Sequence, residues 1–170
     1  MKKTLLISLL ISVLLLGCNN KPDNVPDIFP CTVSVTNGTT PINDVFIVLA
    51  LETGGTEYSM SGTTNSSGRA TMRTSRLSWR GNGVPAGTYR VSLSKTPAVS
   101  GISPEEYQCL SAEEQEVYNN EQEKKREKEP REIPEYLSDF VRSPFQITVA
   151  KGQENFLAVD VAALPAKPKK

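Results

Sequence analysis

Residues 89–94 read YRVSLS, an alternation in which every second side chain is apolar. Because successive side chains of a strand point to opposite faces of a sheet, this alternation puts Tyr89, Val91 and Leu93 on one face. The three apolar side chains predict a strand that has one face in a core and the other in solvent.

Strand-like apolar segments recur along the chain from residue 31 onward. Residues 31–35 (CTVSV) and 145–149 (FQITV) alternate in the same way, and residues 45–51 (VFIVLAL) are continuously apolar, as in a central strand. The turn sequences between the apolar segments, such as 65–68 (NSSG), favour hairpins. Shorter strands are expected at residues 58–61, 70–74 and 157–161. About seven short strands at this spacing predict an all-β fold, an antiparallel β-sandwich.

One region departs from the strand pattern. Ser103 and Ser111 each stand three residues before a glutamate, which is the signature of a helix N-terminus. Residues 122–129 are almost wholly charged, and a proline follows them. We therefore expect a charged helical insertion at about residues 103–130, before the last two strands. A charged helix of this kind is more often a solvated face than a docking surface.

The N-terminus has the pattern of an export signal. A short basic segment precedes an apolar run that is too short to cross a bilayer and ends in LLGC at residues 15–18. This ending resembles the lipobox of bacterial lipoproteins, which implies a signal peptide at residues 1–17 and lipidation of Cys18. The alternative is an ordinary secretory signal with an incidental cysteine. Residues 18–30 are then a polar tether, 31–162 the β-sandwich and 163–170 a basic disordered tail.

The resemblance also implies a location. Acylation would attach the chain to a membrane, because several acyl chains anchor a protein firmly. The residue after Cys18 is Asn19 and not aspartate, which in Gram-negative lipoproteins resembles an outer-membrane signal more than an inner-membrane one. We expect a lipid-anchored protein of the cell envelope.

Three segments of the body resemble one family. Residues 61–70 (SGTTNSSGRA) are similar to the hairpin, and residues 84–91 (VPAGTYRV) to the strand entry, of carboxypeptidase regulatory-like domains. Residues 133–139 (IPEYLSD) and 143–145 (SPF) resemble the segment before the closing strands in small lipoproteins that carry this domain. The resemblance spans residues 32 to 161 and implies a prealbumin-like Greek-key sandwich, the fold of transthyretin, without catalysis.

Composition excludes several classes of function. Lys plus Arg and Asp plus Glu both number 19, so the charge gives no reason to expect nucleic acid as a partner. The chain has no histidine, which removes the commonest general base and the commonest metal ligand. We expect no catalytic residues, no cofactor and no metal site.

Five residues stand out individually. Cys31 and Cys109 can pair as a disulfide that pins the insertion to the first strand, or remain two separate thiols, one in the core and one on the insertion. Trp79 lies between Arg76 and Arg80 in an expected loop, residues 76–82. These three side chains suit a partner contact, although a single Trp is more often packed over a sandwich edge.

The expected function is that of a non-catalytic, lipid-anchored envelope protein. Such a protein would bind a protein or polysaccharide partner, or support a surface assembly, through its loops or its insertion. One alternative is an oligomeric, transthyretin-like carrier of a small ligand. A more remote alternative is a hydrolase that works without histidine.

Overall fold

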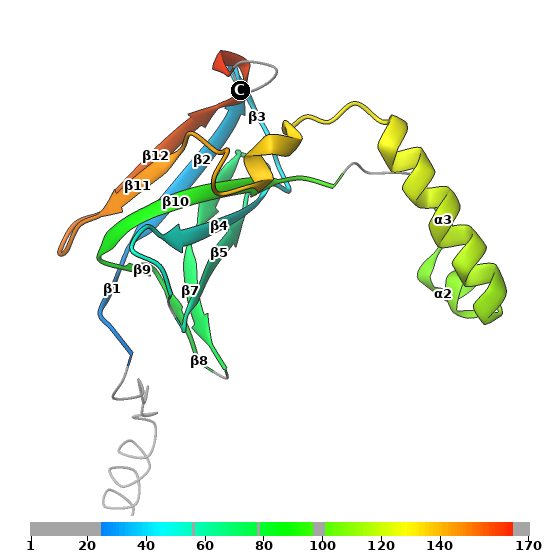
Figure 1. Ribbon diagram of the computed structural model, residues 1–170, viewed down its shortest axis with the longest axis horizontal. Coiled ribbons are helices and arrows are strands. Elements are labelled where there is room, and N and C mark those ends of the chain that lie inside the picture. The colour runs from blue at the N-terminus through cyan, green and yellow to red at the C-terminus, as the bar shows by residue number, and fades with distance from the viewer. Residues whose placement is uncertain (1–24, 56, 78, 97–100, 165–170) are drawn as a thin grey trace, which may run out of the picture.

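The computed structural model describes residues 25–55, 57–77, 79–96 and 101–164. The main body consists of two sheets whose buried faces lie toward each other, and a pair of helices projects from one end (Figure 1). The protein is therefore β-rich and sandwich-like, which confirms the all-β character expected from the alternating segments.

The larger sheet has six strands in the order β11-β10-β4-β5-β7-β8, and every neighbouring pair is antiparallel. Tyr89, Val91 and Leu93 lie on β10 and are each at most 2% exposed, so the opening alternation of the sequence is confirmed. The six strands are β4 (Phe46–Leu51), β5 (Ser59–Thr63), β7 (Arg73–Arg76), β8 (Trp79–Asn82), β10 (Gly87–Ser94) and β11 (Gln146–Val149).

The smaller sheet is built on β2 and has the order β12-β2-β3, with β6 also paired to β2. Its strands are β2 (Cys31–Asn37), β3 (Thr40–Pro41), β6 (Arg69–Thr71) and β12 (Asn155–Asp160). β2 is antiparallel to β3 and β6 but parallel to β12, which corrects the expectation of an entirely antiparallel sandwich. The parallel pair arises because the short turn after β11 passes the chain to the other sheet, so the turn sets the direction of β12.

The number of strands also differs from the expected seven or so. The described chain has twelve strands, and several have only two or three residues. Two of them, β1 (Ile28–Phe29) and β9 (Val84–Pro85), form a separate antiparallel pair beside the larger sheet. The strand expected at residues 70–74 is divided between β6 in one sheet and β7 in the other.

Met72 is the residue at which the chain changes sheets. Its backbone N–H donates to the carbonyl of Cys31 at 2.9 Å, and its carbonyl accepts from the N–H of Gly83 at 2.9 Å. Ala70, Met72 and Thr74 are all fully buried, so the two-residue alternation continues through the bend. One continuous alternating segment therefore contributes to both layers.

Strand residues occupy most of the described part of the loop expected at residues 76–82. Trp79–Asn82 is β8, which pairs with β7 and forms an edge of the larger sheet. The turn before it places Leu77 at a φ of 49°, and the buried-side position of β8 is Gly81. A Cβ at Gly81 would lie 2.5 Å from the end of the Ile28 side chain and 2.7 Å from the Trp79 ring, so a side chain there would have to displace them. Because Gly81 has no apolar side chain, residues 79–82 lack the alternation of apolar and polar side chains that predicts a strand.

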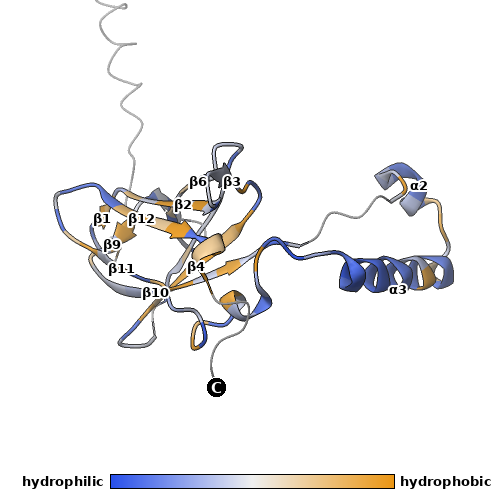
Figure 2. Ribbon diagram, turned by 90° about the horizontal axis from the view of Figure 1, so that it is seen from above, coloured by the Kyte–Doolittle hydropathy of each residue, from blue (hydrophilic) through white to orange (hydrophobic). Residues whose placement is uncertain are grey.

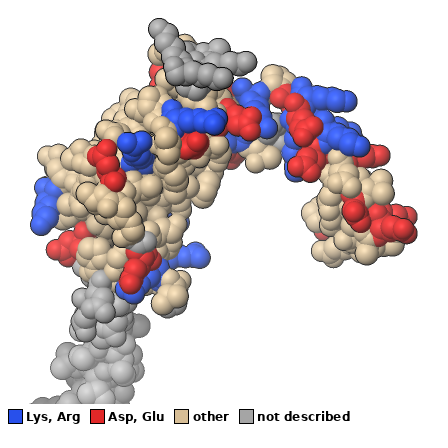
Figure 3. All heavy atoms as spheres, viewed as in Figure 1, with Lys and Arg blue, Asp and Glu red and all other residues tan. Residues whose placement is uncertain are grey.

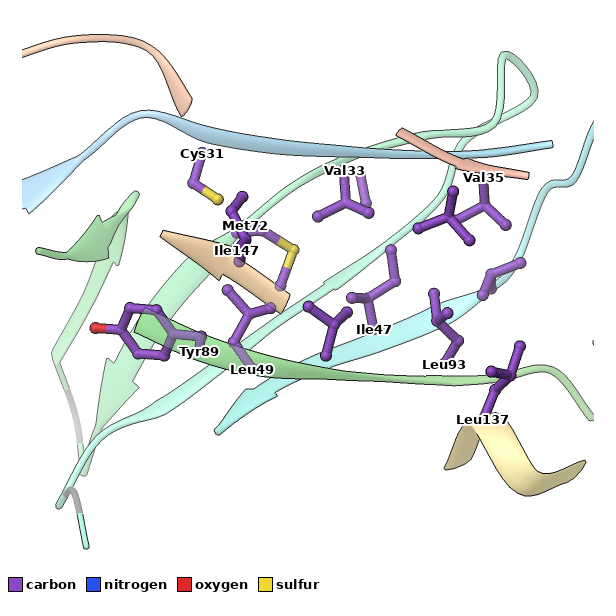
Figure 4. Close-up of a cluster of buried hydrophobic side chains, with 14 of the residues drawn as sticks. Cys31, Val33, Val35, Ile47, Leu49, Met72, Tyr89, Leu93, Leu137 and Ile147 are labelled. Atoms are coloured by element: carbon purple, nitrogen blue, oxygen red, sulfur yellow. The ribbon is translucent and has the colours of Figure 1, made fainter. Parts of the chain in front are cut away.

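The core lies between the two sheets (Figure 4). Valines of β2 face Ile47 and Leu49 of β4, and Leu137 of the short 3-10 helix Glu135–Ser138 closes one end. Tyr89 is buried at the other end, where its hydroxyl donates to the carbonyl of Pro85 at 2.9 Å. A second 3-10 helix, Val161–Ala163, follows β12.

The helical insertion lies between β10 and β11, as the sequence predicts, but it consists of two helices. Both α2 (Pro104–Gln108) and α3 (Ala112–Lys128) begin with the expected capping box, at Ser103 and Ser111 respectively. The second box starts a new helix because its serine takes an extended backbone conformation. α3 is hydrophilic along almost its whole length (Figure 2). Within the described residues, no helix combines the length and the apolar character needed to span a membrane.

Candidate binding groove

A groove of about 560 Å³ lies on the outer face of the larger sheet, where β6 approaches β5. It contains three arginines and no acidic residue. We call it the arginine groove, and its lining consists of Phe46, Ser61, Gly62, Thr63, Asn65, Arg69, Thr71, Arg73, Ser75 and Arg80.

The bend between β6 and β7 builds the centre of the groove. Because Ala70, Met72 and Thr74 point into the core, the side chains between them point outward. Arg69 and Arg73 are both exposed on this outward face. Burial of the three small or apolar side chains therefore directs the side chains of Arg69 and Arg73 to the outer face.

Strand register brings the other residues beside them. Arg73 stands directly opposite Ser61 on β5, and Ser75 stands opposite Arg80 on β8. Arg73 and Arg80 are diagonal neighbours on adjacent strands, for which the separation is about 7–8 Å. Arg69 is four residues from Arg73 across the bend at Met72, which is at most roughly 13 Å. The backbone positions of the three arginines therefore lie in a row and not at one point.

Gly62 lies where β5 packs against the bend between β6 and β7. A Cβ at Gly62 would lie 3.0 Å from the sulfur of Met72 and 3.1 Å from the carbonyl oxygen of Thr71. These contacts are tighter than a side chain normally makes, so the glycine lets β5 approach the bend closely.

The hairpin before β6 holds Arg69 at the end of the row. The Oδ1 atom of Asn65 accepts hydrogen bonds from the N–H groups of Ser67 and Arg69, at 3.0 and 3.1 Å, and from the Ser67 hydroxyl. Gly68 completes the turn at a φ of 70°, a conformation that favours glycine. The backbone position of Arg69 is therefore set by hydrogen bonds within the turn.

The three groove arginines make no ion pair with any described residue. Elsewhere, Arg76 pairs with Glu57, and Arg90, Lys95, Arg131 and Arg142 each have a carboxylate partner. In a protein with no net charge, the groove is thus a local concentration of positive charge. Guanidinium groups without carboxylate partners are suited to bind anionic ligands, which they can contact through two parallel hydrogen bonds.

Hydroxyl groups and one aromatic ring complete the lining. Ser61, Thr63 and Thr71 present hydroxyls that can both donate and accept hydrogen bonds. Phe46 lies opposite Thr63 on β4 and is 48% exposed. The groove therefore combines cationic, hydroxyl and apolar surface on a rigid sheet.

Of the three residues expected to contact a partner, only Arg80 lines this groove. The guanidinium of Arg76 lies 5.4 Å from the centre of the Tyr58 ring, in addition to its ion pair. Trp79 lies opposite Arg76 on β7 and packs close to Gly81 at the sheet edge. Arg76 and Trp79 therefore have local packing roles in the structure.

The cysteines expected to pair are free. Cys31 is buried in the core and Cys109 is exposed at the end of α2, on the helical pair that projects from the sheets (Figure 1). The expected disulfide is therefore absent, and the two separate thiols of the alternative are present. Burial raises the pKa of Cys31 to about 11, so its thiol is protonated at neutral pH. Cys18, with the rest of residues 1–24, lies outside the described residues.

The other shifted pKa values also have structural causes. Hydrogen bonds from Ser103 and Ser111 lower the pKa of Glu106 and Glu114, the carboxylates of the two capping boxes. Desolvation raises the pKa of the Tyr89 hydroxyl. Within the described ranges, no group of three or more His, Cys, Asp and Glu side chains could hold a metal ion.

A second hollow, of about 800 Å³, lies between α3 and the end of β10. Its lining carries both signs of charge, and Lys and Arg lie beside Glu over α3 (Figure 3). Two of its cations are already paired, Lys95 with Glu132 and Arg131 with Glu135. This hollow therefore has less unbalanced charge than the arginine groove.

Sequence reasoning missed Arg69 and Arg73. Their signal was the alternation of residues 69–75, which places both on the face opposite the buried side chains. Comparison of the chain with models of protein families, with curated proteins and with solved structures finds no match.

Proposed function

We propose that this chain is a non-catalytic, lipid-anchored protein of the cell envelope whose β-domain binds a partner through the arginine groove. One observation carries the proposal: three exposed arginines line one groove without a carboxylate among them. Cations left unpaired on a rigid sheet provide binding energy for an anion. The titratable groups with shifted pKa values belong to the core and the helix caps, which favours binding over catalysis.

The anchoring part of the proposal rests on the N-terminal sequence. A basic start, an apolar run and LLGC at residues 15–18 together form the pattern that lipoprotein processing requires. Acyl chains on Cys18 would hold the domain at a membrane surface. The expected tether of residues 18–30 is shortened, because Val25 is 6% exposed and Ile28–Phe29 form β1. Residues 19–24 would then be the tether, with a reach of roughly 20 Å when extended. The β-domain would then meet ligands within the envelope.

We also propose that the sandwich is of the Greek-key, prealbumin-like type found in carboxypeptidase regulatory-like domains. The Asn65–Gly68 turn and the Pro85–Gly87 approach to β10, two segments of the resemblance, both occupy ordered positions at strand ends, which supports the proposal. An experimental structure in which the strand connections differ from a Greek key would contradict this part.

Membrane fractionation tests the anchor. The wild-type chain is expected in the membrane fraction, whereas Cys18→Ser is expected in the soluble fraction after export. Globomycin, which blocks the lipoprotein signal peptidase, should cause a longer precursor to accumulate. A Cys18→Ser chain that remains membrane-bound would contradict lipid anchoring.

Crosslinking in intact envelopes tests the groove. The measurement compares material crosslinked to the wild type, to Arg73→Gln and to Arg142→Gln. Arg142 is an exposed arginine outside the groove, so its substitution removes the same charge at a different place. The proposal expects a crosslinked species that is lost in Arg73→Gln and kept in Arg142→Gln. Equal crosslinking by both variants would exclude the groove as the binding site.

A further inference from the structure

We propose that the arginine groove binds a linear polyanionic polysaccharide, a sugar chain that carries acidic groups at intervals along its length. This inference rests on the proposed binding function of the groove and names the chemical class of its ligand. Arg69, Arg73 and Arg80 would each contact a separate acidic group, and the hydroxyl side chains between them would bond to the sugar hydroxyls.

The row of cations indicates a ligand with more than one anionic group. Arg69 and Arg73 leave the backbone on either side of the bend at Met72, four residues and at most roughly 13 Å apart. Arg73 and Arg80 are separated by about 7–8 Å across two strands. A single small anion could not use all three positions without drawing the side chains together against their mutual repulsion. A polymer with repeated acidic groups can contact all three arginines without moving their side chains together.

The rest of the lining favours a sugar. Ser61, Thr63 and Thr71 offer hydroxyls, which can donate to or accept from the hydroxyls of a sugar in either orientation. Phe46 exposes about half of its surface at the end of the groove, where its ring can contact the apolar face of a sugar.

The same lining does not favour single-stranded nucleic acid. Such ligands are held by several aromatic rings on which successive bases stack, in a protein surface with long-range positive charge. The groove has one aromatic residue, Phe46, and the whole chain has equal numbers of acidic and basic side chains. Short-range pairing with arginines, not long-range attraction, would therefore dominate binding.

Calorimetry on the full-length lipidated chain in detergent tests the proposal. The probe is polygalacturonate, a linear polysaccharide with one carboxylate on each sugar. Dextran supplies the sugar without the charge, and galacturonic acid supplies one charged sugar alone. Polyglutamate and oligothymidylate supply repeated charge without a polysaccharide. Polygalacturonate is expected to bind at least tenfold more tightly than each of the other four probes.

Two matched variants connect binding to the groove. Arg73→Gln, at the centre of the row, is expected to weaken polygalacturonate binding roughly 5- to 10-fold, as for the loss of an exposed charge-assisted contact. Arg142→Gln is expected to bind as the wild type does. The wild-type affinity should fall as NaCl is added, and less steeply for Arg73→Gln, because one ionic contact is missing.

The outcomes separate this inference from the proposed function. Equal binding of polyglutamate or oligothymidylate would replace the sugar with another polyanion and overturn the inference. Equal affinities of Arg73→Gln and Arg142→Gln for polygalacturonate would also overturn it. Either result leaves the proposed function standing if crosslinking in envelopes still depends on Arg73. If crosslinking is also independent of Arg73, the proposed function fails as well.

Discussion

Thr64 joins the two segments that bound one end of the arginine groove, and its replacement by valine tests how that end is held. Thr64 follows β5 and is 2% exposed. Its hydroxyl donates to the carbonyl of Ile42 at 2.8 Å and accepts from the N–H of Val45 at 2.9 Å. Its backbone pairs with Asp44 and Val45 at 2.9 and 3.0 Å. This residue therefore connects the end of β5 to the start of β4.

The expected loss in the free energy of unfolding follows from the groups that each substitution removes. Thr64→Val keeps the shape of the side chain but leaves one buried N–H and one buried carbonyl without a partner. Each unsatisfied group costs about 1–3 kcal/mol, and the added methyl recovers part of this, so we expect a loss of about 2–4 kcal/mol. Thr64→Ser keeps both hydrogen bonds and removes one methyl group, for which we expect a loss of about 1 kcal/mol.

Urea denaturation of the wild type and the two variants, followed by circular dichroism, measures this difference. The free energy of unfolding should decrease in the order wild type, Thr64→Ser, Thr64→Val. The m-value should stay constant, since neither change alters the surface exposed on unfolding. If Thr64→Val proved as stable as Thr64→Ser, the hydroxyl would not satisfy the backbone of residues 42–45, and the reasoning would be wrong.

Three further predictions concern the rest of the chain. In the native protein at pH 8, iodoacetamide should modify Cys109 and not Cys31, because burial raises the pKa of Cys31 to about 11; mass spectrometry shows whether one or two thiols react. The lowered pKa of Glu114 means that its cap stabilises α3 above pH 4.5 and that this effect disappears as the pH falls through the folded-state pKa; Glu114→Gln should flatten that part of the ellipticity profile at 222 nm. Gly68→Ala should cost more than about 2 kcal/mol in urea denaturation, because its Cβ would lie 2.6 Å from a backbone carbonyl oxygen, whereas Gly38→Ala, with a similar φ and open space, should cost about 1 kcal/mol.

Local pattern predicts most of the secondary structure but not how the strands are joined. The alternation of residues 31–35 and 89–94 predicts β2 and β10, because burial of one face is encoded in each segment by itself. The two capping boxes likewise predict the helical insertion from residues three apart, although not its division into α2 and α3. The parallel alignment of β12 with β2 has no such local signal. Residues 31 and 155 meet only after the whole chain has folded, and an alternating strand has the same pattern in either direction.

The same limit applies to the candidate site, since local sequence predicts only part of the arginine groove. Residues 69–75 (RATMRTS) already show which side chains point outward, so a period of two is enough to place Arg69 and Arg73 on one face. The presence of Arg80 beside them depends on the pairing of Ser75 with Arg80, a register that the sequence of neither strand specifies. The absence of a carboxylate is a property of the assembled face, because the lining comes from β4, β5, β6, β7 and β8 and depends on which of these strands lie side by side. A binding site made of unpaired charge is therefore visible only once every possible partner has been placed, whereas a core can be recognised strand by strand.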